Sequence, residues 1–137
     1  MSDPVAMAPG SVLNPRALSG RVMKANMPRE IKESDWKLLR RLHAVALERF
    51  CKQVIEDINH ATANCNEDFH KRYLKVFDLI MGRNEKMAWA FDDMRRSKAI
   101  ILLANIKESG LLTDEEFSQF SPETREAVEV ILDIRRR

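Results

Sequence analysis

The chain has few of the residues that interrupt helices, with four glycines and five prolines among its 137 residues. A β-rich fold of this length needs turn residues between its many short strands, so this scarcity favours helices. Four of the five prolines and two of the four glycines fall within the first 33 residues. We therefore expect an all-α fold over the rest of the chain.

Cysteine, long apolar runs and charge of one sign are also scarce. The two cysteines, Cys51 and Cys65, cannot form a disulfide framework. No apolar run approaches the roughly 18 residues that span a bilayer, and no continuous apolar stretch marks a signal peptide. The 23 basic and 21 acidic residues leave a formal net charge of +2, too small for a strong attraction to nucleic acid by the whole molecule. We therefore expect a cytoplasmic protein with no membrane partner.

The first 33 residues differ from the rest because no stretch there sustains a helical or alternating apolar period. Two interpretations stay open: a disordered tail, or an arm that becomes ordered against a partner chain. The second interpretation rests on apolar residues scattered between the helix breakers, at Val5, Val12, Leu13, Leu18, Val22 and Met23. The predicted organisation is a flexible or partner-ordered arm over 1–33, followed by a helical domain over 34–137.

The first two predicted helices follow from apolar periodicity and capping residues. The first runs from about residue 35 to 60 after an N-cap at Ser34. One of its apolar rows consists of Leu39, Leu42, Ala46 and Phe50. The second helix, about 67–81, is expected to end at Gly82. Its predicted core residues are Phe69, Tyr73, Val76, Phe77 and Ile80.

The third predicted helix covers about 85–109 after a cap at Asn84. Residues 99–104 are apolar all round, which predicts that this helix is the central element of the domain. Thr113 and Glu116 then form a capping box that opens a short helix.

A last helix is predicted over about 122–134, because Ser121 precedes a proline at the first helical position. The predicted architecture is a small helical bundle of three principal helices plus a short C-terminal helical hairpin, preceded by an irregular N-terminal arm.

Several stretches of the helical domain are similar to known sequences: SDWKLLRRLH and ALERFC near its start, and RRS, GLLTDEEF and FSPETR towards its end. They resemble a family of small uncharacterised proteobacterial helical proteins, over roughly residues 34–132. The resemblance implies a bacterial, intracellular protein and brings no activity with it.

Signatures of catalysis and cofactor binding are absent from the sequence. The four glycines are isolated, so no phosphate-binding loop is present, and no Gly-x-Ser-x-Gly occurs. His60, Cys65 and His70 are not closely paired and are fewer than the four ligands of structural zinc sites. Glu67 and His70 form one Glu-x-x-His, whereas di-iron bundles need two. We expect no enzyme activity, no cofactor and no metal site.

Tryptophans and arginine doublets are the candidate interaction residues. Exposed tryptophan is a frequent hot spot of interfaces, but tryptophan also closes the ends of helical cores. Arginine doublets that converge on one face favour phosphate binding, but they also complement helix ends. Both interpretations stay open for the candidate set Trp36, Arg40, Arg41, Trp89, Arg95 and Arg96.

The sequence therefore predicts a non-enzymatic protein-interaction or adaptor module, whose partner is another protein or a second copy of the chain. The alternative is a nucleic-acid-associated regulatory protein that uses its clustered arginines. No helix-turn-helix signature supports that alternative, which rests on the basic clusters alone.

Overall fold

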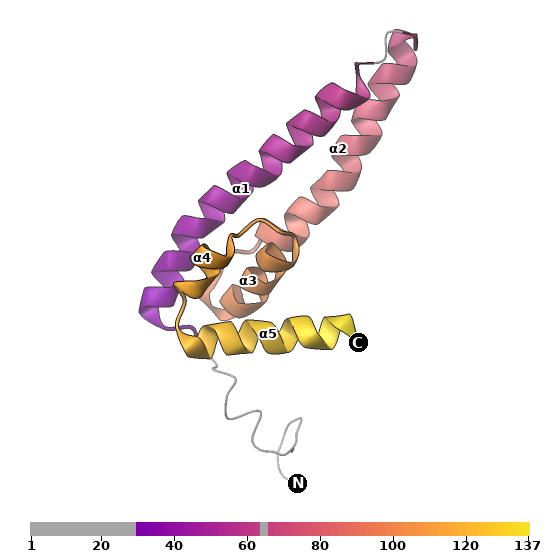
Figure 1. Ribbon diagram of the computed structural model, residues 1–137. Helices are drawn as coiled ribbons and strands as arrows, with labels where there is room; N and C mark the ends of the chain where they lie inside the picture. Colours follow the sequence, from indigo (N-terminus) through magenta and orange to yellow (C-terminus); the bar gives the residue numbers. More distant parts are fainter. Residues whose placement is uncertain (1–29, 64–65) are drawn as a thin grey trace.

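The computed structural model describes residues 30–63 and 66–137, and these residues form helices and loops without any strand (Figure 1). The predicted all-α class is therefore confirmed. The elements in chain order are α1 (Glu33–Ala61), α2 (Phe69–Phe91), the 3-10 turn η3 (Arg96–Lys98), α3 (Ala99–Glu108), α4 (Asp114–Ser118) and α5 (Pro122–Arg136). Most of the predicted arm, residues 1–29, lies outside the described residues. Ile31 is buried in the core of the helical domain.

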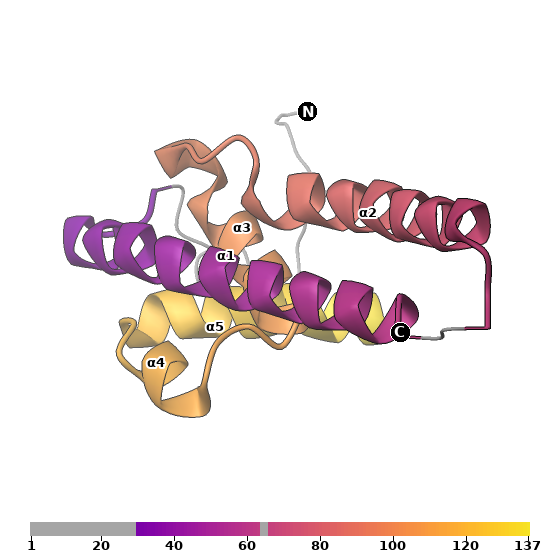
Figure 2. The ribbon, with the colours of Figure 1, turned by 90° about the horizontal axis from the view of Figure 1, so that it is seen from above.

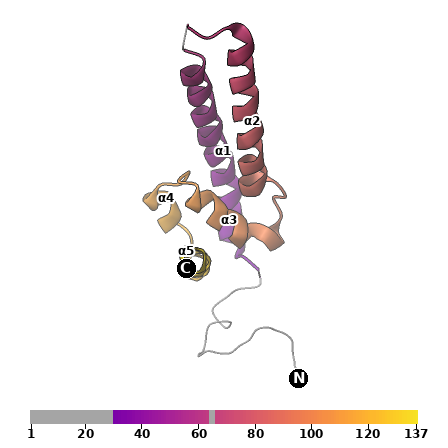
Figure 3. The same cartoon turned by 90° about the vertical axis from the view of Figure 1, so that its right-hand side faces the viewer.

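The two long helices α1 and α2 form an antiparallel hairpin that projects from the rest of the domain (Figures 1 and 3). Seen from above, α2 lies beside the later part of α1, and the first turns of α1 extend beyond the end of α2 (Figure 2). The three shorter helices α3, α4 and α5 gather at the open end of the hairpin, with α3 in contact with α1, α2 and α5. We call these three helices the base, and residues 51–61 of α1 with residues 69–83 of α2 the distal hairpin.

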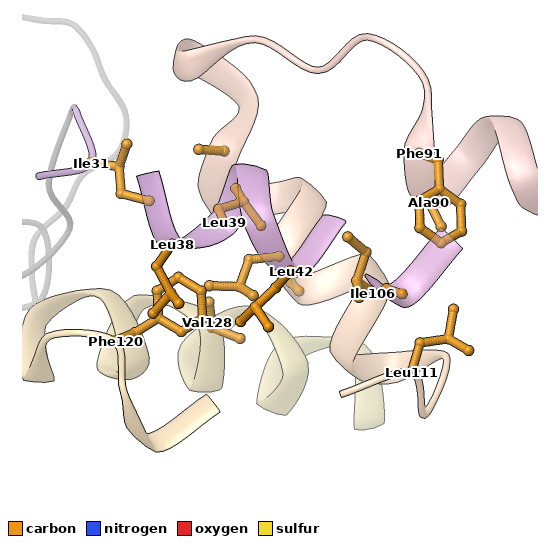
Figure 4. Packing of buried hydrophobic residues seen from close by; sticks show 14 of the residues in the cluster. Ile31, Leu38, Leu39, Leu42, Ala90, Phe91, Ile106, Leu111, Phe120 and Val128 are labelled. Carbon is orange, nitrogen blue, oxygen red and sulfur yellow. The ribbon is translucent and has the colours of Figure 1, made fainter. Parts of the chain in front are cut away.

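The core of the domain lies where α1 and α2 meet the base (Figure 4). The predicted row of α1 is buried there, which confirms that part of the prediction. Residues 99–104 form most of α3, and α3 contacts α1, α2 and α5, so this segment is the central element as expected. Leu103 is wholly buried, whereas Ile101 is 51% exposed. Other buried members of the core are Phe91, Ile106, Leu111, Phe120, Val128 and Leu132.

The predicted boundary between the second and third helices is wrong. Helix α2 continues through Gly82 and Asn84 and ends at Phe91. A glycine costs a helix only about 1 kcal/mol relative to alanine, and the flanking residues are good helix formers. The break comes instead between α2 and η3, where Asp93 adopts a left-handed φ of 63°. Aspartate tolerates that conformation better than most residues do, but position 93 falls inside the helix predicted over about 85–109.

The predicted N-cap at Ser34 is also wrong, because α1 begins at Glu33 with Lys32 as its N-cap. The acidic side chains of Glu33 and Asp35 in the first turn favour this start, since they complement the positive end of the helix. Ser34 is instead an exposed residue inside that turn.

Asp35 is buried, with 3% of its surface exposed, and it fastens α1 to the start of α5. Its carboxylate accepts hydrogen bonds from the Ser121 backbone N–H at 3.0 Å and from the Thr124 hydroxyl at 2.7 Å. It also accepts from the Ser121 hydroxyl, while the Ser121 oxygen in turn caps the N–H of Thr124. A carboxylate of α1 therefore completes the N-terminal cap of α5.

The predicted capping box of α4 is confirmed. The Thr113 hydroxyl accepts from the Glu116 N–H at 3.0 Å, and the Glu116 carboxylate accepts from the Thr113 N–H at 2.9 Å. Arg49 of α1 then binds both oxygens of that carboxylate, at 2.7 and 2.8 Å, and donates to the Leu111 carbonyl oxygen at 2.9 Å. The hydrogen bonds from Arg49 and Thr113 lower the pKa of Glu116 to about 2.

Candidate interaction surface

Four of the five apolar residues predicted to be the core of the second helix are exposed, so that prediction is wrong for them. The exposed fractions are 82% for Phe69, 65% for Tyr73, 50% for Phe77 and 38% for Ile80. Only Val76 is half-buried. Ile55 of α1 has an exposed fraction of 56%. The distal hairpin thus presents its apolar residues to solvent.

The lengths of the helices explain why these residues stay uncovered. Helix α1 has 29 residues and is about 43 Å long, whereas α3 has 10 residues and is about 15 Å long. The base therefore covers only the open end of the hairpin. The periodicity of 67–81 correctly indicated an apolar stripe, but no remaining helix of the domain reaches it.

A groove between α1 and α2 opens on the distal hairpin and has a volume of about 170 Å³. Its lining is mainly apolar and consists of Phe50, Cys51, Val54, Ile55 and Ile58 from α1, with Ile80, Arg83, Asn84 and Met87 from α2. From Ile80, the helical row of α2 continues through Phe77 and Tyr73 to Phe69, at spacings of three and four residues. The groove and this row make one continuous surface.

We call this surface the apolar face. It consists of Cys51, Ile55 and Ile58 of α1 and of Phe69, Tyr73, Phe77 and Ile80 of α2. Cys51 and Ile58 are half-buried, and Cys51 also packs against the core. Leu74 and Met81 are exposed along its outer edge.

On α1, the apolar face points away from the base. Arg49 and Ile58 are nine residues apart, and at about 100° per residue they lie on opposite sides of the helix. Arg49 binds Glu116 and the Leu111 carbonyl of the base region. Ile58 lines the groove. Arg49 and Ile58 thus lie on opposite sides of α1, while Phe50 both belongs to the buried core and lines the groove.

The same relation holds on α2, where Ile80 and Trp89 are nine residues apart. The Trp89 carbonyl accepts a hydrogen bond at 2.8 Å from the side chain of Asn105 in α3. The guanidinium of Arg135 in α5 lies 5.5 Å from the centre of the Trp89 ring. Trp89 thus contacts the base from across α2 relative to Ile80, whereas Phe91, eleven residues after Ile80 and on the same side of α2, is buried in the core.

The opposite side of the distal hairpin is polar. Gln53, Glu56 and His60 of α1 are exposed there, and helical spacing sets them across the helix from Ile58 and Ile55. Between the two sides, Asp57 forms a salt bridge at 2.7 Å with Arg83 at the rim of the groove, which links the two helices. The hairpin is therefore amphipathic, with one apolar and one charged side.

The two predicted tryptophans lie at the base end of the hairpin. Trp36 is half-buried and packs against the core. Trp89 keeps 42% of its surface exposed and stacks under Arg135. Neither belongs to the apolar face. The four α2 residues of the face were missed because they were assigned to the core, and Ile55 was not singled out.

The predicted arginines are divided between free and paired side chains. Arg40 and Arg41 are exposed on α1. Arg95 forms a salt bridge with Asp93 at 2.6 Å, and its hydrogen bond lowers the pKa of that aspartate. Arg96 forms a salt bridge with Glu33 at 2.5 Å and donates to the Ile31 carbonyl. Arg95 and Arg96 thus contact Asp93, Glu33 and Ile31, none of which belongs to the predicted set of interaction residues.

Metal-ligating side chains do not gather anywhere in the described residues, since no group of three or more histidine, cysteine, aspartate or glutamate residues is arranged to hold one ion. Cys65 of the predicted trio with His60 and His70 lies outside these residues. None of the helices within 30–63 and 66–137 has the length and apolar character needed to cross a membrane.

Comparison of the chain with protein-family models, with curated proteins and with solved structures finds no match. The resemblance to a proteobacterial family therefore stays a prediction. Any functional conclusion depends on the surface of this chain itself.

Proposed function

We propose that the protein is a non-enzymatic protein-interaction module and that its binding surface is the apolar face of the distal hairpin. The observation that supports this proposal is the exposure of three aromatic side chains, Phe69, Tyr73 and Phe77, in one helical row. Exposed apolar surface in water costs free energy, and a partner that covers it recovers that free energy.

The size of the apolar face supports an interaction site. Its exposed fractions correspond to an accessible area on the order of 600 Å², given the surface of aromatic and aliphatic side chains. The largest apolar patch on a typical monomer is roughly 300–600 Å², and patches at the upper end of that range usually bind something. Single exposed apolar residues such as Ile101 and Ile134 do not indicate a binding site, because isolated apolar side chains are common on protein surfaces.

The composition of the apolar face also fits a protein partner. Aromatic residues are enriched at the centres of protein interfaces, and charged residues are depleted there. The seven residues of the face include three aromatic ones and no charged one. The charged residues of the hairpin lie at the rim of the groove, as with Arg83, or on the polar side.

The nucleic-acid alternative has less support. Binding to phosphates needs basic side chains whose charge is free to replace counterions. Arg95, Arg96, Arg135 and Arg136 are each in a salt bridge with a carboxylate of this chain. Two basic pairs of the described residues have no carboxylate partner, Arg40 with Arg41 on α1 and Lys71 with Arg72 on α2, and Arg72 instead donates to the Thr62 carbonyl and lies over the Phe69 ring. Two pairs are a small footprint for phosphate binding.

The proposal includes a bacterial, cytoplasmic setting. The resemblance noted in the sequence and the lack of a disulfide framework support that setting.

A matched pair of substitutions on α1 tests the proposal. Ile55→Glu places a carboxylate in the apolar face, whereas Gln53→Glu places the same group two residues away on the polar side. Tagged parent and variant chains are expressed in cells of the source organism and purified, and co-purifying proteins are quantified by mass spectrometry, with untagged copies of the chain counted as a partner.

We expect at least one partner to be retained by the parent and by Gln53→Glu and to be lost from Ile55→Glu. Recovery of the same proteins in the same amounts with all three chains contradicts the proposal. A gel-shift titration with duplex DNA and with RNA, repeated at two salt concentrations, tests the nucleic-acid alternative on the same samples.

A further inference from the structure

We infer that the partner of the apolar face is a second copy of this chain, so that two distal hairpins stack face to face as a four-helix arrangement. This inference rests on the proposed function, because it names the partner of the same surface.

The width of the apolar face favours a two-helix partner. Its exposed residues come from both helices, with Ile55 on α1 and the Phe69 to Ile80 row on α2. A single docked helix fills the groove between α1 and α2 but leaves the outer residues of each helix in water. A second hairpin brings two helices, and four-helix bundles are the usual way to bury two such apolar surfaces together.

The position of the base leaves the apolar face open to such a partner. Arg49 and Trp89 contact the base region from the sides of the two helices that lie opposite Ile58 and Ile80. The distal hairpin also extends well beyond the base (Figure 3). Two copies can therefore bring their faces together without contact between either base and the opposing face.

The seven residues of the apolar face are uncharged, which suits self-association. Residues close to a two-fold axis meet their own copies, so a charge placed there meets a like charge. The charges beside the face are Arg83, which lines the groove and is paired with Asp57, and Arg72, whose guanidinium lies 5.1 Å from the centre of the Phe69 ring. The seven uncharged residues can therefore lie at a two-fold axis without a contact between like charges.

The area is close to what a stable dimer needs. With Leu74 and Met81 on its edge, the face offers roughly 800 Å² per chain, and specific interfaces of standard size bury about 800 Å² on each partner. Both partners contribute the same residues, so full burial of the patch on each chain is the largest area that this contact can reach.

Sedimentation equilibrium of the full chain tests the inference, over about a hundredfold range of concentration. We expect the parent to approach twice the 15.9 kDa mass of one chain as the concentration rises. Ile55→Glu is expected to raise the dissociation constant about tenfold or more, because two unpaired carboxylates enter an apolar contact. Gln53→Glu is expected to match the parent.

Circular dichroism of each variant checks that the helices remain formed, and the mass of the parent does not depend on any variant. A parent that stays at 15.9 kDa at every concentration overturns the inference, as does a dimer that Ile55→Glu and Gln53→Glu weaken equally or not at all. The co-purification experiment then decides the proposed function separately, since a different protein lost only from Ile55→Glu supports the function without self-association.

Discussion

The base and the distal hairpin use the same kinds of apolar residues in opposite ways. In the base, Leu103, Phe120 and Val128 are fully buried, and a buried carboxylate and a bidentate salt bridge fasten the helices together. In the distal hairpin, aromatic residues of equal size are in contact with water. The difference teaches that an apolar side chain of the hairpin is buried where α3 or α5 extends far enough to cover it. The hydrophobicity of the helix itself does not decide its burial.

The largest expected effect on the free energy of unfolding comes from a substitution in the core of the base. Leu103→Ala in α3 removes a wholly buried side chain from the centre of the core. We expect the free energy of unfolding to fall by about 2–5 kcal/mol, from lost burial and the cavity left behind. Urea denaturation followed by circular dichroism measures it. A loss below about 1 kcal/mol would place the stabilising core elsewhere.

The link between α1 and α5 is expected to contribute the next largest effect. Asp35→Ala leaves the buried Thr124 hydroxyl and the Ser121 N–H without their acceptor. We expect a loss of about 2–3 kcal/mol in the free energy of unfolding, because unsatisfied buried groups keep their full desolvation cost. Asp114→Ala, an exposed acid in the first turn of α4, is the control, and we expect a change of about 0.5 kcal/mol or less.

The salt bridge between Arg49 and Glu116 predicts a pH dependence. The pKa of Glu116 falls from its usual 4.5 to about 2 in the folded chain, so the folded state stabilises the carboxylate. The resulting stability is fully present above pH 4.5 and is lost as the pH falls towards 2.

Glu116→Gln measures the contribution of this salt bridge to the free energy of unfolding, because the substitution removes the charge of the side chain but keeps its shape. We expect the parent to exceed the variant by about 1–2 kcal/mol at neutral pH, after allowance for the partial exposure of Arg49. The gap should narrow steadily in acid. A gap that is constant from pH 7 to pH 2.5 would contradict the assignment.

Gly82→Ala tests whether α2 is continuous, with a smaller effect of the opposite sign. An added methyl group at Gly82 meets no atom within 4 Å, and the residue lies inside the helix. We expect thermal denaturation to show a gain of about 0.5–1 kcal/mol, since alanine is the better helix former. A helix that ended at this residue with a left-handed conformation would be destabilised by the same change.

The smallest effect is expected on the apolar face. Phe69→Ser replaces a side chain that is 82% exposed, so the free energy of unfolding should change by about 0.5 kcal/mol or less. The measurement is made at concentrations where the parent is monomeric, so that association does not contribute. A loss as large as that from Leu103→Ala would show that Phe69 belongs to a core, and the contrast between the two regions would fail.

Local signals in the sequence predicted the helical class, the buried row of α1, the apolar centre of α3, the capping box at Thr113 and the start of α5 at Pro122. These features depend on residues close together in the chain. The sequence did not predict that Asp35 caps α5, because the two segments meet only through the tertiary fold. The predicted end of the second helix was wrong because Gly82 and Asn84 were taken as helix boundaries, although the residues around them are good helix formers.

The apolar face was found in the sequence as a stripe but was assigned to the wrong environment. Periodicity identifies which residues share a side of a helix, and it says nothing about whether another element reaches that side. Only the lengths of the other helices decide this, and those lengths depended on the misplaced boundary after Gly82.

Because the base and the apolar face lie on opposite sides of the same two helices, selection can act on them separately. A substitution such as Phe77→Leu changes a half-exposed side chain of the apolar face, and the free energy that keeps the base folded should stay nearly constant. Single substitutions can therefore reshape this surface without passing through a poorly folded chain.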